Sequence, residues 1–161
     1  MKGPLVLIAS LTAAMAFPGC TADGVREFTI HVGWNADGKS QYMTPSEVKV
    51  HKGDKVRFIV VNDDDPNKDY NGDQPQRDNF HDVALRDYDG DGDGAPEDIE
   101  HEVPAGETTR TCLPQAEPDT KCAAGKDFFK ATTTGTFRII CEVNTSPSHD
   151  ALGMHASFVV E

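Results

Sequence analysis

The segment from Val48 to Asn62 constrains the fold most, because apolar and polar residues alternate through almost all of it. An alternation with a period of two puts every second side chain on one face, which is typical of a strand with one buried face. Lys52-Gly53-Asp54 interrupts the pattern as a turn signal and divides the segment into two strands. The residues expected to face the core are Val56, Phe58 and Val60.

Similar alternating stretches recur along the chain, and turn-forming residues separate them. Strands are expected at residues 25–32, 80–85, 135–141 and 156–160, with two shorter ones around Pro104. No stretch combines the helical period with sufficient length. About eight short strands favour an all-β fold, a Greek-key β-sandwich with long acidic loops. With 161 residues and 37% apolar content, the chain can form one domain with its own core.

Three ligands for a soft metal lie within fourteen residues near the C-terminus. Cys141 ends an expected strand, and His149 and Met154 follow it. Thiolate and thioether groups favour Cu(I), whereas imidazole also suits Cu(II). A second histidine would complete the set of two histidines, one cysteine and a weak methionine that is typical of blue copper. His81, at the start of the strand 80–85, is the candidate for that ligand.

These residues resemble the cupredoxin family of blue-copper proteins, in particular its plastocyanin and halocyanin-like members. His81-Asp-Val-Ala-Leu85 is similar to the first ligand element of the family, and His149 and Met154 have its His-x4-Met spacing. The segment 48–62 is similar to the family's Val-x-x-Gly-Asp-x-Val-x-Phe run. Between Cys141 and His149, however, seven residues replace the usual two to four.

The resemblance implies one type 1 copper site and the transfer of single electrons between redox protein partners. Cys141 would be the strong covalent ligand, His81 and His149 the equatorial histidines, and Met154 the axial ligand. The resemblance also implies that His149 reaches the surface and serves as the port for electrons. His155 is the alternative imidazole ligand, although the alternation puts it on the face opposite Met154.

Two other functions would use a chain of this kind and stay open. A copper chaperone or storage protein would hold an exchangeable ion, and an extracellular binding module with a cupredoxin-like fold would hold no metal. A binuclear copper centre is disfavoured because it needs a second cysteine between positions 141 and 161, where the sequence has none. An enzyme is not expected, since no Ser-His-Asp arrangement, phosphate loop or open three-histidine site is evident.

Residues 1–19 are expected to be an export signal, followed by a single domain over residues 20–161. One positive charge precedes an uncharged apolar stretch that suits a signal peptide and is too short to cross a bilayer. Ala14-Met-Ala16 fits a cleavage site, whereas Gly19-Cys20 resembles a lipoprotein box, and we favour lipidation of Cys20. The protein would then be periplasmic or at the cell surface, and the lipid would be its only contact with the membrane.

Cys112 and Cys122 are expected to form a disulfide, because exported proteins meet oxidising conditions and only nine residues separate the two cysteines. Closing so short a loop would contribute roughly 2–3 kcal/mol to stability in the chain-entropy model. The alternative is a second metal-binding pair of thiols, which lacks a histidine nearby.

The run from Asp89 to Glu100 matches the calcium-loop pattern D-x-D-x-D-G-x5-E, in which alternate carboxylates converge on a hard cation. Its flanks are a strand and a turn, not the two helices of an EF-hand. A bound calcium ion and a solvated acidic turn are therefore the two interpretations. The calcium ligands would be Asp89, Asp91, Asp93 and Glu100.

The 15 basic and 27 acidic residues give a net charge of -12, and the acids are concentrated after residue 60. Such a field repels nucleic acid and anionic membranes and would steer a partner with a basic docking surface. Adaptation to high salt explains the same composition without a partner. Residues 63–79 are expected to form an exposed acidic loop across the metal end. His51 and His101 are expected at the surface, and Trp34 at one end of the sandwich.

Overall fold

The computed structural model describes residues 19–68, 70, 79–90, 94, 97–111, 127–143 and 145–161. Within these ranges every regular element is a strand, and no helix that could cross a membrane is found among them. The expected cleavage site, both cysteines of the expected disulfide and two of the calcium ligands fall outside the described residues. The side chain of Cys20 falls outside them too, so its lipidation stays a prediction.

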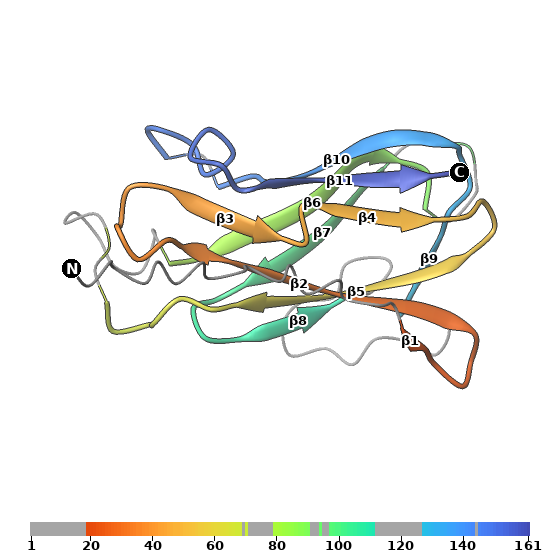
Figure 1. Ribbon diagram of the computed structural model, residues 1–161, viewed down its shortest axis with the longest axis horizontal. Helices are drawn as coiled ribbons and strands as arrows, with labels where there is room; N and C mark the ends of the chain where they lie inside the picture. The colour runs from red at the N-terminus through yellow and green to blue at the C-terminus, as the bar shows by residue number, and fades with distance from the viewer. Residues whose placement is uncertain are drawn as a thin grey trace, which may run out of the picture.

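In the described part of the chain, eleven strands form two sheets that face each other as a β-sandwich (Figure 1). The first sheet is built on β2 (Val25–Trp34) and β5 (Lys55–Asn62), which pair in parallel. Four shorter strands complete this sheet, namely β1 (Gly19–Cys20), β3 (Gln41–Thr44), β8 (Thr108–Arg110) and β9 (Phe129–Lys130).

The second sheet has five strands in the order β4-β11-β10-β6-β7. They are β4 (Glu47–Val50), β11 (His155–Val160), β10 (Gly135–Cys141), β6 (His81–Tyr88) and β7 (Glu97–Val103). The turn after β4 leads to β5 in the opposite sheet, so these two neighbours in sequence do not pair. The expected all-β sandwich is confirmed. The structure has more strands than the expected eight, and the additional strands are short ones of two to four residues.

The core lies between the sheets and consists of the inward-facing members of the alternating strands. Val56, Phe58 and Val60 are at most 1% exposed, as the alternation predicts. Burying a side chain of this kind contributes about 1.5–3 kcal/mol. Edge-to-face contacts join a group of aromatic rings within this core, those of Phe58, Tyr88, Phe129 and Phe158.

His101 also lies in the core, so the expectation that it is exposed is wrong. It faces inward from β7, and its ring contacts Phe58. Nδ1 lies 3.3 Å from the carbonyl oxygen of Val83, and Nε2 lies 3.1 Å from Thr111 Oγ1. Burial lowers the pKa of His101 to about 4, so the ring is neutral at pH 7. His51 is exposed, as expected.

Candidate metal centre

The sheet register brings the expected ligands to one end of the sandwich. His81 begins β6 and Cys141 ends β10, and these strands run antiparallel with Cys141 opposite Val83. Because side chains alternate along a strand, His81 shares a face with Val83 and therefore with Cys141. The connection from β10 to β11 then carries His149 and Met154 back across the same end.

The donor atoms of three residues converge on a common point. His81 Nδ1 lies 3.1 Å from His149 Nδ1, and Cys141 Sγ lies 3.9 Å and 3.5 Å from these two atoms. The point equidistant from all three atoms is about 2.0 Å from each, close to the ~2.0–2.1 Å and ~2.3 Å of zinc bonds to nitrogen and sulfur. The three side chains are therefore spaced to share one metal ion.

Backbone hydrogen bonds to His149 and Cys141 hold Met154 beside this donor group. Its N–H donates to the carbonyl oxygen of His149 (3.1 Å), and its own carbonyl accepts from the N–H of Cys141 (3.2 Å). The side chain of Met154 is fully buried. Gly153 has a φ of +108°, and a Cβ there would lie 3.0 Å from the carbonyl oxygen of Gln41. The turn that presents Met154 thus requires a glycine.

His155 does not belong to the donor group. Its side chain is 53% exposed and pairs with Asp150 on the surface. Among the described residues, the group that combines histidine with cysteine consists of His81, Cys141 and His149. The structure therefore favours His149 over His155 as the second imidazole.

Burial sets the protonation states of the metal-free donors. It raises the pKa of the Cys141 thiol to about 11. Burial, with a contribution from the neighbouring His81, lowers the pKa of His149 to about 4. At pH 7 the imidazole of His149 is thus neutral and able to bind a metal, whereas the thiol must first lose its proton.

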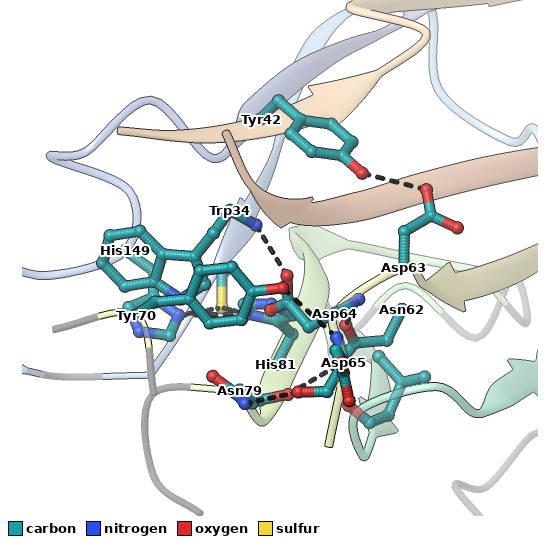
Figure 2. Close-up of polar contacts among 12 residues, drawn as sticks. Trp34, Tyr42, Asn62, Asp63, Asp64, Asp65, Tyr70, Asn79, His81 and His149 are labelled. Atoms are coloured by element: carbon teal, nitrogen blue, oxygen red, sulfur yellow. Dashed lines mark hydrogen bonds and ion pairs between the residues drawn. The ribbon is translucent and has the colours of Figure 1, made fainter. Parts of the chain in front are cut away.

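Trp34 and Tyr70 form an aromatic cover over His149, so His149 does not reach the surface as the resemblance implies. His149 is 0% exposed, and its ring makes an edge-to-face contact with Trp34 at a centroid distance of 6.1 Å. Trp34 stacks in turn on the half-buried Tyr70, with centroids 6.0 Å apart (Figure 2). None of the described residues offers a hydrogen-bond partner to the buried Nε2 of His149. Trp34 closes this end of the sandwich, as expected.

Asp64 is the residue at this site that the sequence interpretation missed. The acidic segment 63–79 is expected to be exposed, yet Asp64 is buried and its Oδ2 lies 2.9 Å from His81 Nε2. A signal was present in the alternation of β5, since Val60 and Asn62 face inward and Asp64 continues their phase. Its two acidic neighbours, Asp63 and Asp65, are exposed and hide that phase.

The expected calcium ligands are only partly described. Glu100 lies in β7, and its carboxylate lies close to those of Asp98 and Glu142. Asp89 accepts a hydrogen bond from the N–H of Gly94 (3.2 Å). Asp91 and Asp93 fall outside the described residues, so calcium binding at this loop stays a prediction.

Comparisons with known proteins bear on the fold. No protein-family model matches the chain, and no curated protein sequence matches it either. Among solved structures, the chain is similar to a multicopper oxidase from Pseudomonas thermotolerans, with 14% identity and a TM-score of 0.51 over 84% of this chain and 29% of that one. It is also similar to auracyanin B, with 16% identity and a TM-score of 0.49 over 84% of this chain and 88% of that one.

A third similar structure is auracyanin A, described as a blue copper protein from Chloroflexus aurantiacus, with 18% identity and a TM-score of 0.47 over 84% of this chain and 99% of that one. At these identities the likeness to the oxidase shows the fold alone. The expected sandwich fold is confirmed, and three of the four expected ligands form one donor group. The donor group of His81, Cys141 and His149 can hold one metal ion.

Proposed function

We propose that this protein is a type 1 copper protein that carries single electrons between redox partners outside the cytoplasm. The main support is the spacing of His81 Nδ1, His149 Nδ1 and Cys141 Sγ around one point about 2.0 Å from each. Copper, when bound, would supply a one-electron couple between Cu(II) and Cu(I). Two imidazoles with a thiolate suit both oxidation states.

The chain's own residues would hold the ion in a fixed arrangement. Cys141 would supply the strong thiolate bond, and His81 and His149 the equatorial nitrogens. Met154 would supply the weak axial contact that adjusts the potential. The pairing of β6 with β10 and the backbone bonds of Met154 restrain these side chains before any ion arrives.

Burial of the site favours a carrier over a chaperone. His81, Cys141 and His149 are at most 2% exposed. A chaperone passes its ion from donor to donor, so its ligands must be accessible to the partner. An electron needs no such contact with the ion. The same burial favours a carrier over an oxidase or reductase, because Trp34 and Tyr70 cover His149 and leave a substrate no direct approach on that side.

The redox partner would dock with a basic surface, since this chain carries 27 acidic and 15 basic residues. A partner at the metal end would contact the cover of Trp34 and Tyr70 rather than His149 itself. Association should therefore weaken as ionic strength rises, because screening shortens the reach of the acidic field. An export signal, with Cys20 as the lipid anchor, would place the protein in the periplasm or at the cell surface.

The test of this function is a visible and EPR spectrum of the full chain after addition of Cu(II). We expect an intense thiolate-to-copper band in the wild type, its loss in Cys141→Ser, and its retention in His155→Gln, which is the matched control at an exposed histidine. Voltammetry should then show a reversible one-electron wave. Loss of the band in both variants, or a wild type without the band, contradicts the proposed site. A band without a reversible wave favours the chaperone.

A further inference from the structure

A buried carboxylate contacts the imidazole of His81 on the side away from the other donors. The side chain of Asp64 is 1% exposed, and its Oδ2 lies 2.9 Å from His81 Nε2 (Figure 2). The opposite nitrogen of the same ring, Nδ1, faces Cys141 and His149. His81 therefore lies between a carboxylate and the metal-binding point.

The surrounding backbone fixes this carboxylate in place. Its second oxygen, Oδ1, accepts from the N–H of Trp34 (2.8 Å). The N–H of Asp64 donates to Asn62 Oδ1 (3.0 Å), and Asn62 Nδ2 donates in turn to the carbonyl oxygens of Asn79 (2.7 Å) and Val103 (3.0 Å). A Cβ at Gly33 would lie 2.9 Å from Asp64 Oδ1, so the absence of a side chain there makes room for the carboxylate.

The chemistry of the contact has two consequences. An ionised carboxylate only accepts hydrogen bonds, so the proton of a neutral His81 ring belongs on Nε2 and the lone pair on Nδ1 points at the other donors. A carboxylate bonded to a ligand imidazole also makes that ligand more basic. A more basic ligand and a nearby negative charge both favour the more highly charged oxidation state of a bound ion.

We propose that Asp64 is a positioning residue that fixes the Nε2-protonated tautomer of His81 and lowers the reduction potential of the site. This proposal rests on the proposed copper function for the potential, but the tautomer of His81 is a property of the metal-free chain. The two parts can therefore be tested separately.

The first experiment is 15N NMR of the histidine side chains in the metal-free full chain. We expect the Nε2 nitrogen of His81 to carry the proton, and this proton to exchange slowly with water. In Asp64→Asn the exchange should be at least tenfold faster. A wild-type His81 with its proton on Nδ1, or with a rapidly exchanging Nε2 proton, overturns the proposal. This readout decides the matter even if Asp64→Asn does not fold.

The second experiment compares the reduction potentials of the copper-loaded wild type, Asp64→Asn and Asp63→Asn. Asp63 is the matched control, because the same charge is lost one residue away, where the side chain is 39% exposed and contacts His31 and Tyr42 instead of His81. Loss of such an outer partner typically changes metal affinity 10–100-fold. We expect the preference of the site for Cu(II) to fall at least tenfold in Asp64→Asn, which corresponds to a rise in reduction potential of at least about 59 mV for a one-electron couple.

The outcomes separate the two proposals. A wild type that binds copper, with a potential that Asp64→Asn leaves unchanged or that both variants raise equally, overturns the role of Asp64 and leaves the copper function intact. A wild type that shows no thiolate band overturns the copper function, while the NMR result still decides the tautomer. A selective rise in Asp64→Asn, with the thiolate band retained, supports both.

Discussion

Copper binding should be strongly dependent on pH, because the Cys141 thiol must lose its proton to become a ligand. Burial raises the pKa of this thiol to about 11, so about one molecule in 10,000 holds a thiolate at pH 7. Ionising it at that pH costs about 5 kcal/mol of binding free energy. His149, with a pKa of about 4, is already neutral and adds no further pH dependence above about pH 5.

The apparent copper affinity should therefore rise about tenfold for each pH unit from pH 6 to pH 10, with release of about one proton per copper at pH 7. Competition against a chelator, corrected for the chelator's own protonation, measures the slope, and an indicator dye in weak buffer measures the proton. Cys141→Ser is the control and should show no such slope. An affinity that levels off near pH 8.5, the ordinary pKa of a cysteine, would refute the argument from burial.

Three further predictions concern the core, the aromatic cover over His149 and the axial position of Met154. In unfolded protein a histidine has a pKa near 6.5, whereas burial lowers the pKa of folded His101 to about 4. When the pH falls from 7 to 5, the free energy of unfolding of the metal-free wild type should therefore fall by about 2 kcal/mol more than that of His101→Gln, as measured by urea unfolding. Parallel losses would contradict this. Trp34→Ala should let azide shift the copper spectrum, whereas Trp34→Phe should not. Met154→Leu should keep the thiolate band and lose less than about 1.5 kcal/mol of stability.

The local pattern of the chain was sufficient to predict the longer strands and the three residues of the donor group. Alternation with a period of two identified the buried face of β5, and the positions of His81 and Cys141 at strand ends were correct. These features are local, since the direction of a side chain along a strand follows from its parity. The donor types alone indicated a soft metal.

Only the tertiary structure decided which strands share a sheet and which polar groups are buried. β4 and β5 form one continuous alternating segment in the sequence, but the turn between them leads into the opposite sheet. His101 lies between two acids in the sequence and was predicted to be exposed, although the register of β7 on β6 turns it into the core. Pairing partners are distant in sequence, so no local pattern contains them.

The sequence by itself determined the strand period, the sandwich class and the four ligand candidates, because each depends on residue type and on spacing along one segment. The tertiary structure decided that three donor atoms meet at one point, that Trp34 covers His149, and that Asp64 supports His81. Each of these depends on the distance between atoms from segments far apart in the chain. That distance is set by strand register and packing.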